Sequence, residues 1–182
     1  MTENDRPLRT FLCHTSSDKD SVQKLYRSLV DDGIDAWLDQ EKLVPGQNWQ
    51  KEIQRAVRNS DVVIVCLSAK SITKEGFVQK EIRIALDFAK EKPDGTIFII
   101  PARLEDCAVP ESMNKFQWVD LFSDNGYERL MNALKLRAEN VGATIGFVAK
   151  DKNVPFNSKI LKNRSDSLRP LDITIDNPTI DN

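Results

Sequence analysis

One short apolar run, DVVIVCLS at residues 61–68, restricts the possible folds of this chain more than any other segment. Its central residues are continuously apolar and mostly β-branched, and a polar residue bounds the run at each end. A strand with one solvated face alternates apolar and polar residues, whereas a strand that is covered on both faces does not. We therefore expect residues 61–68 to form a central strand of a parallel sheet with helices on both faces.

Strand-like and helix-like segments alternate along the first 140 residues. Apolar, β-prone runs predict further strands at residues 8–14, 34–38, 95–105 and 117–122. Apolar residues at helical spacing predict helices around residues 22–30, 49–57, 76–91 and 127–139. This alternation is typical of an α/β domain with a parallel sheet. In such domains ligands bind beyond the carboxyl ends of the strands, so the loops after residues 14, 38, 68 and 105 are expected to carry the site.

Composition and motifs exclude several functional classes. The formal net charge is −2, so the chain lacks the basic character of a nucleic-acid-binding domain. No apolar run approaches the roughly 20 residues of a membrane span, and no signal peptide is visible at the start. The dinucleotide fingerprint GxGxxG and the phosphate loop GxxxxGK[ST] are both absent. We therefore expect neither nucleic acid nor membrane among the partners.

Cysteine and histidine usage predicts a reduced, cytoplasmic protein without a metal site. Cys13, Cys66 and Cys107 are odd in number and widely spaced, and two of them lie inside predicted strands. Reduced, buried thiols are therefore expected rather than disulfides. His14 is the only histidine and no CxxC pair is present, so we expect no metal cofactor.

The predicted helix at residues 76–91, GFVQKEIRIALDFAKE, contains one charge in an unexpected place. At about 100° per residue, the other charged side chains gather on one side and the apolar ones fill the opposite side. Glu81 falls inside the apolar arc, with Phe77, Ala85 and Phe88 among its helical neighbours. Two interpretations follow: the carboxylate reaches solvent at the edge of the arc, or it is held in the apolar arc because it is used there.

The last part of the chain differs from the first 140 residues. VGATIGFVA, at 141–149, is interpreted as one more strand or as a segment docked on the domain. From residue 150 onward, apolar residues are scattered and no period is sustained, so we interpret 141–182 as a linker or flexible tail that leads to or docks on another module. LDITI, at 171–175, is β-prone and can pair as an edge strand with a partner.

Three separated stretches carry a recognisable pattern. They are TFLCHTSSDKD at 10–20, AWLDQEKLVPGQNWQKEI at 36–53 and DVVIVCLSAKSITKEGFVQKEIRIAL at 61–86. The first joins a strand to a His and a polar loop, and the second joins a strand, an Asp and a Pro-Gly loop to a Trp that opens a helix. In order and spacing, over about residues 8–138, the chain resembles the Toll/interleukin-1 receptor (TIR) domain family, particularly its bacterial members.

The resemblance implies a flavodoxin-like fold with a five-stranded parallel sheet over residues 1–140. In enzymatic members it implies cleavage of the bond between nicotinamide and ribose in NAD⁺, which is then a substrate and not a cofactor. The products are nicotinamide and ADP-ribose or a cyclic ADP-ribose. The resemblance also implies homotypic association between TIR domains, and for many bacterial members a role in antiphage defence. Other members are scaffolds that only bind other TIR domains.

The resemblance also assigns roles to individual residues. Glu81 aligns with the catalytic Glu of the enzymatic members, and Phe77 stands where they often have a Trp that stacks on nicotinamide. The other expected substrate contacts lie after the first strand, in the second loop and after the third strand, at His14, Thr15, Ser16, Asp39, Leu43, Gly46, Trp49 and Ser68. A packing role for Phe77, a structural role for His14 and a helix cap at Ser68 are the alternatives.

Three functions are consistent with these residues. An NAD⁺ glycohydrolase or cyclase is favoured because a carboxylate is present at position 81. A non-enzymatic module that binds other TIR domains through its Pro45–Gly46 loop is the alternative, since such a module need not keep that Glu. A different α/β hydrolase or transferase that acts on nucleosides is the third.

Overall fold

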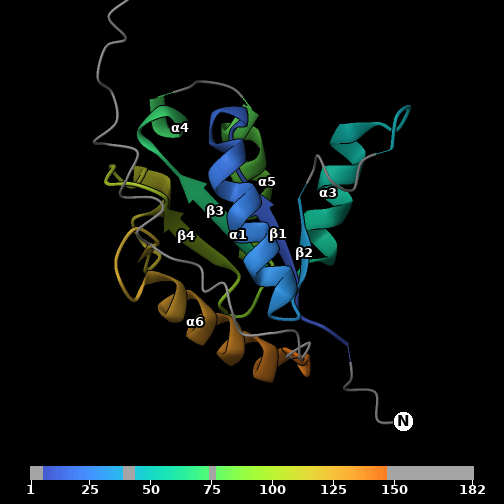
Figure 1. Cartoon of the computed structure of the whole chain (residues 1–182). Helices are drawn as coiled ribbons and strands as arrows, with labels where there is room; N and C mark the ends of the chain where they lie inside the picture. The colour runs from blue at the N-terminus through green and yellow to red at the C-terminus, as the bar shows by residue number, and fades with distance from the viewer. Residues whose placement is uncertain (1–5, 39–43, 74–76, 147–182) are drawn as a thin grey trace, which may run out of the picture.

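The computed structural model describes residues 6–38, 44–73 and 77–146, and Figure 1 shows their arrangement. They form one five-stranded sheet in which every strand pair is parallel and the order is β2-β1-β3-β4-β5. The strands are β1 (Arg9–Cys13), β2 (Asp35–Trp37), β3 (Val62–Leu67), β4 (Ile99–Arg103) and β5 (Val119–Asp120). This arrangement confirms the predicted flavodoxin-like α/β fold.

The predicted central strand occupies the middle of the sheet. All six residues of β3 are buried, which is why the run carries no polar alternation. It pairs with β1 on one side and with β4 on the other. The last strand is shorter than the predicted 117–122, because only Val119 and Asp120 pair with β4, whereas Gln117 and Trp118 are exposed.

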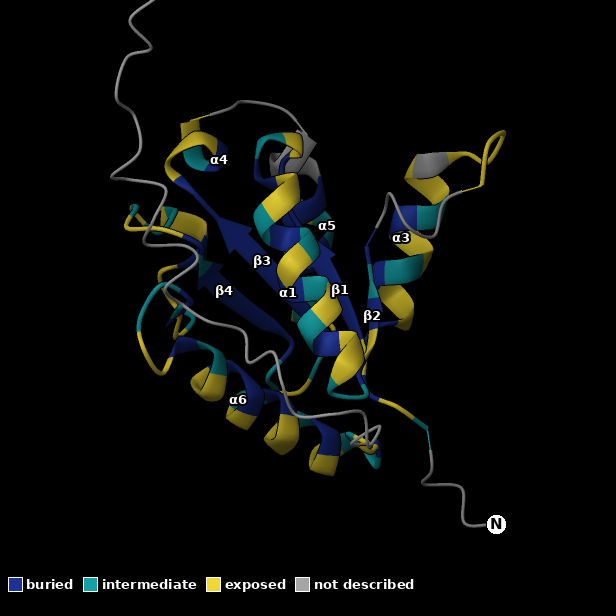
Figure 2. Cartoon of the chain, viewed as in Figure 1, coloured by how far each residue is buried: buried dark blue, intermediate teal, exposed yellow. Residues whose placement is uncertain are grey.

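Two helical layers cover the two faces of the sheet. On one face lie α1 (Lys19–Asp31) and α6 (Gly126–Val141), and on the other lie α3 (Trp49–Asn59) and α5 (Phe77–Lys90). Alternate residues of each strand point to opposite faces, so Leu12 packs in the α1–α6 core and Phe11 in the α3–α5 core. Figure 2 shows that β1, β3 and β4 are buried between these layers, while the outer faces of the helices are exposed.

Short helical turns follow two of the strands and had no counterpart in the predicted elements. A 3₁₀ turn, η1 (Ser16–Asp18), joins β1 to α1, and a five-residue helix, α4 (Ala69–Thr73), begins two residues after β3. A further turn, η2 (Glu111–Met113), places Met113 in the α3–α5 core. Segments this short carry too few apolar positions to show a helical period in the sequence.

The described chain ends in a segment that docks beside the start of β1. Thr144 forms an isolated parallel bridge with Pro7, in which the Leu8 N–H donates to the Thr144 carbonyl at 3.1 Å. Gly33 has a φ of +82°, and a Cβ at this position would overlap the carbonyl of Gly146. Of the two interpretations of residues 141–149, docking therefore applies to the described part, and residues 147–182 lie outside the described residues.

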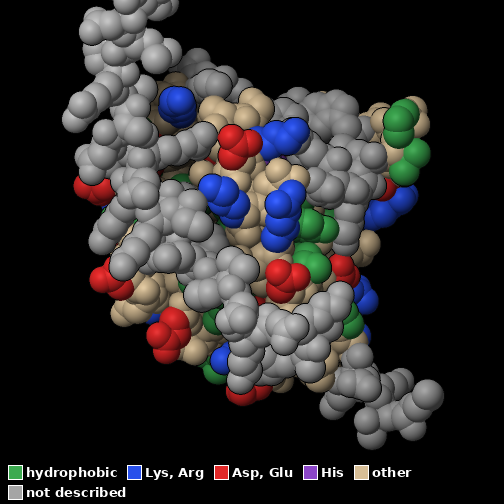
Figure 3. Space-filling model, viewed as in Figure 1, with side chains coloured by type: hydrophobic (Ala, Val, Ile, Leu, Met, Phe, Trp, Pro, Cys, Tyr) green, Lys and Arg blue, Asp and Glu red, His purple; other side chains and the backbone are tan. Residues whose placement is uncertain are grey.

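The surface that carries α1 is charged and mixed in sign. Figure 3 shows Lys and Arg side chains over α1 with Asp and Glu side chains interspersed. Among the helices that the structure describes, none has the length and the apolar character that crossing a membrane requires.

Candidate functional site

The carboxyl edge of the sheet, where β1 and β3 end, holds a buried carboxylate. Glu81 lies in the second turn of α5 with 3% of its surface exposed. The thiol of Cys13, the last residue of β1, donates a hydrogen bond to Glu81 Oε2 at a Sγ···O distance of 3.1 Å. The two residues are 68 positions apart in the chain, so the fold itself brings this pair together.

The burial of Glu81 decides between the two interpretations of its place in the helix. Its neighbours Ile82 and Ala85 are buried against the sheet, in the core shared with α3. A carboxylate at the edge of the apolar arc would be exposed to solvent, and Glu81 is not. Burial of a carboxylate is costly unless hydrogen bonds or charges compensate for the lost hydration. Glu81 is therefore a carboxylate that the fold holds away from bulk water.

A second buried carboxylate, Asp18, organises the loop that follows β1. Its Oδ2 accepts hydrogen bonds from the hydroxyls of Thr15 and Ser68, each at 2.8 Å. Thr15 follows β1 and Ser68 follows β3, so this one oxygen ties together the ends of two adjacent strands. Asp18 was not among the residues predicted from the sequence. The TxxD spacing of Thr15 and Asp18 was the available signal, but the contact with Ser68 depends on the register of β1 and β3.

Ser68 also caps the short helix α4, and this is the structural alternative to a substrate contact that the sequence predicted. The Ser71 N–H donates to Ser68 Oγ at 3.1 Å, and the Ser68 N–H donates to Ser71 Oγ at 2.7 Å. The N–H of Ala69, the first residue of α4, donates to Glu105 Oε1 at 2.8 Å. Ser68 therefore has a structural role whether or not it also contacts a substrate.

The three cysteines form no disulfide, and two of them, Cys13 and Cys66, are buried in β1 and β3. Burial, followed by the negative charge of Asp18, raises the pKa of the Cys66 thiol far above its ordinary value. A thiol with such a pKa stays protonated at neutral pH and does not act as a nucleophile. Cys107 is half-buried rather than buried, and burial raises its pKa as well.

The other predicted site residues have different environments. His14 and Thr15 are buried directly after β1, whereas Ser16 is exposed. Gly46, with a φ of +92°, lies in an exposed turn that projects at the start of α3 (Figure 1). Asp39 and Leu43 lie outside the described residues, as do the side chains of Trp49 and Phe77, whose backbones begin α3 and α5.

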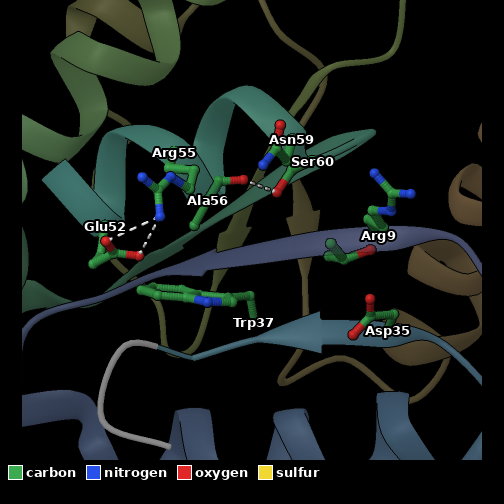
Figure 4. A pocket seen from close by; sticks show the side chains of 9 residues that line it. Arg9, Asp35, Trp37, Glu52, Arg55, Ala56, Asn59 and Ser60 are labelled. Atoms are coloured by element: carbon green, nitrogen blue, oxygen red, sulfur yellow. Dashed lines mark hydrogen bonds and ion pairs between the residues drawn. The ribbon is translucent and has the colours of Figure 1, made fainter. Parts of the chain in front are cut away.

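A separate pocket of about 270 Å³ lies between α3 and the first two strands (Figure 4). Trp37 forms one wall and stacks on Phe11 with 4.9 Å between the ring centroids. On the opposite wall, Arg55 forms an ion pair with Glu52. Among the residues that the structure describes, none of those predicted to act in catalysis or substrate binding lines this pocket. We therefore place the candidate site at the carboxyl edge, where Glu81 and Asp18 lie, and not in this pocket.

These features define a flavodoxin-like α/β domain in which most of the buried polar side chains gather at the carboxyl edge of the sheet. The TIR domain family matches residues 10–134, which is more than half of the chain, and the chain therefore belongs to this family. Membership agrees with the resemblance seen in the three sequence stretches. Because the family includes both enzymes and scaffolds, membership alone does not distinguish between these two functions.

One curated relative matches part of the sequence, and solved structures support the fold. A curated protein of Sinorhizobium fredii (strain NBRC 101917 / NGR234), described as uncharacterized protein y4cD, is 30% identical in an alignment over 100 residues that covers 48% of this chain and 16% of that protein. Most of that relative therefore lies outside the match. The TIR domain of the Toll-related receptor TRR-2 from Hydra magnipapillata superposes with a TM-score of 0.59 at 21% identity, over 70% of this chain and 98% of that domain.

A prokaryotic SEFIR domain is a further structural neighbour. It superposes with a TM-score of 0.51 at 15% identity, over 69% of this chain and 96% of that domain. At these sequence identities, both structural matches show a shared fold and nothing about function.

Proposed function

We propose that the chain is a TIR-domain NAD⁺ glycohydrolase or cyclase, which cleaves the bond between nicotinamide and ribose. The observation that carries the proposal is the burial of Glu81 at the carboxyl edge of the sheet, with the Cys13 thiol as a hydrogen-bond donor. A scaffold gains nothing from a buried carboxylate at this place, because the residue does not reach the surface through which a partner would bind. A catalytic role accounts for the cost of burying it.

The chemistry requires one negative charge near the ribose. Nicotinamide leaves NAD⁺ as a neutral molecule, so its departure needs no general acid. The ribose C1′ takes on positive, oxocarbenium-like character as the bond breaks, and a nearby carboxylate stabilises this charge. Water or a nucleophilic atom of the same substrate then attacks C1′, which gives the linear or the cyclic product. In this proposal Glu81 supplies the charge, and its burial strengthens the electrostatic interaction.

The cluster around Asp18 is further evidence for a site at this edge of the sheet. Thr15 and Ser68 bind one carboxylate oxygen, and this holds the ends of β1 and β3 in a fixed relation. His14 lies on the same loop between Cys13 and Thr15 and is buried. In this proposal the cluster holds the loop after β1 in position, while Glu81 is the carboxylate that acts on the substrate.

The test is the release of nicotinamide from NAD⁺ by the purified protein, over a range of protein concentrations. Glu81→Gln keeps the shape of the side chain and removes the charge, so we expect release to fall by about 100-fold or more. Glu91→Gln, which changes an exposed carboxylate just after the same helix, is the matched control and should release nicotinamide like the unchanged protein. Equal release by the Glu81 variant, or none by the unchanged protein when concentrated, would overturn the proposal.

Homotypic association is the second candidate function, and the exposed turn before α3 favours it. Val44 is 61% exposed and stands beside Pro45 and Gly46, so an apolar side chain is presented at a projecting turn. We expect this turn to contact a second TIR domain and to raise activity by assembly, in a role such as antiphage defence. Sedimentation of the unchanged protein and of Val44→Asp tests this, and equal association by both would contradict it.

A further inference from the structure

A groove at the amino end of the sheet has no part in the candidate site. It encloses about 730 Å³ beside the start of β4, between the loop after α5, the segment before β5 and the first turns of α6. The candidate site lies at the opposite, carboxyl end of the parallel strands. Any ligand of this groove therefore binds without touching Glu81 or Asp18.

The groove has an apolar lining and cationic side chains around it. Phe98, Ile99, Phe116 and Leu130 are among the apolar residues that line it, and Trp118 is 36% exposed there. Four cationic residues line it, of which Lys90 pairs with Asp87, and Lys92, Lys115 and Arg129 are the other three; among the described residues of the lining, Asp94 is the acidic one. Among the residues that the structure describes, none of these three cations forms an ion pair with a carboxylate. An acidic partner with apolar side chains would complement this surface.

The groove also lies where the sheet is incomplete. β5 pairs only with Ala102 and Arg103, the carboxyl half of β4. In the described part of the chain, Ile99 and Ile100 have a strand neighbour on the β3 side alone. An extended segment that lies in the groove would continue the sheet past the short strand β5.

The sequence contains one segment with the matching pattern. In LDITID, residues 171–176, Leu171, Ile173 and Ile175 alternate with Asp172 and Asp176. A strand puts such alternate residues on opposite faces, so its apolar side chains would face the groove while its carboxylates lie near the cations. From residue 171 to 182 the sequence has no Lys or Arg.

The connection to this segment is long enough. The described chain ends beside the start of β1, at the same end of the sheet as the groove. The 24 residues at 147–170 span up to about 80 Å when extended, which exceeds the roughly 40 Å diameter of a domain this size. We propose that residues 171–176 of this chain dock in the groove as an added strand, held by Lys92, Lys115 and Arg129. This inference goes beyond the proposed function and does not depend on NAD⁺ cleavage.

Hydrogen–deuterium exchange of the full chain, followed by mass spectrometry, tests the proposal. We expect the amides of residues 171–176 to exchange at least tenfold more slowly than those of a synthetic peptide with the sequence of 168–182. The combined variant Lys92→Glu, Lys115→Glu and Arg129→Glu should abolish this protection, and so should Asp172→Lys with Asp176→Lys. Combining both sets of reversals should restore it, because the complementary charges are then exchanged.

Controls separate docking from other causes of protection. Lys19→Glu, Lys24→Glu and Arg27→Glu together make the same charge change on exposed positions of α1 and should leave the protection unchanged. Ile173→Asp with Ile175→Asp removes the apolar contacts without altering the folded domain, and should abolish protection by itself. Absence of protection in the unchanged chain, or protection that survives both reversals, would overturn the proposal. Protection that grows with protein concentration would assign the groove to a second copy and overturn intramolecular docking.

Discussion

Two carboxylates at opposite ends of the sheet, the half-buried Asp61 and the buried Asp18, have different hydrogen-bond partners. Asp61, just before β3 at the amino end, is bound by both terminal nitrogens of the Arg6 guanidinium, at 2.7 and 3.0 Å. Asp18, at the carboxyl end, accepts from two neutral hydroxyls. A carboxylate with a guanidinium partner contributes to the stability of the fold, whereas a buried one with neutral donors is only partly compensated for its lost hydration.

We expect this difference to separate an end of the molecule that stabilises the fold from the end that carries the proposed site. Besides Arg6, the amino end uses the Arg9 N–H, which donates to Asp61, and Arg137, which donates to the Asp61 carbonyl. These contacts join β1, β3 and α6. Glu81 at the other end takes a hydrogen bond from a thiol, a weaker donor than a guanidinium. The comparison predicts that substitutions at the amino end change stability and that those at the carboxyl end change activity.

The largest expected effect is the loss of activity in Glu81→Gln without loss of stability. Because the amide is neutral, its burial costs less than that of the carboxylate, so the midpoint of thermal unfolding should stay the same or rise. Thermal unfolding and nicotinamide release are to be measured on the same preparations. If Glu81→Gln loses activity only in proportion to its loss of folded protein, the carboxyl end is not functionally different from the amino end.

At the amino end, Asp61→Asn should show the opposite behaviour. The amide cannot form the charged pair with Arg6, so we expect the free energy of unfolding to fall by about 1–3 kcal/mol. Nicotinamide release per folded molecule should not change, because Asp61 lies at the far end of the sheet from Glu81. Urea unfolding measures the change in the free energy of unfolding. Asp87→Asn, at an exposed carboxylate that pairs with Lys90, is the matched control, for which we expect a change below about 0.5 kcal/mol.

The pH dependence of stability sharpens the same contrast. Burial raises the pKa of Asp61, but the hydrogen bonds from Arg6 and from the Arg9 N–H outweigh it and hold the pKa below its ordinary value of 3.8. A carboxylate with a lowered folded-state pKa stabilises the fold above its ordinary pKa, and this contribution is lost as the pH falls through the folded-state pKa. Between about pH 6 and pH 2, the unchanged protein should therefore lose more stability than Asp61→Asn. Parallel losses in urea titrations would contradict the assignment.

Much of the fold could be predicted from the sequence, because its signals are local. The apolar run of β3 and the helical period of α5 each lie within one segment, and each indicated its element and its burial correctly. The period of α5 also placed Glu81 among apolar neighbours. Its burial followed once the helix packed on the sheet.

The partners of the site residues could not be predicted in the same way. The pairs Cys13–Glu81 and Asp18–Ser68 join residues that are 68 and 50 positions apart, so they depend on strand order and register. The close approach of Gly33 to Gly146 is similar: the sequence shows Gly33 as the end of a helix, but only the fold shows what lies against it.

The smallest expected effect concerns the donor to Glu81. Cys13→Ser keeps a hydrogen-bond donor at nearly the same place, so nicotinamide release should stay within about threefold of the unchanged protein. Cys13→Ala removes this donor and positions the carboxylate less firmly, which should lower kcat by about tenfold and leave KM nearly unchanged, because the substrate-binding groups are intact. Cys66→Ala is the matched control, since Cys66 is an equally buried thiol that packs in the other core. If Ser and Ala at position 13 behave alike, Cys13 fills space in the core and does not position the carboxylate.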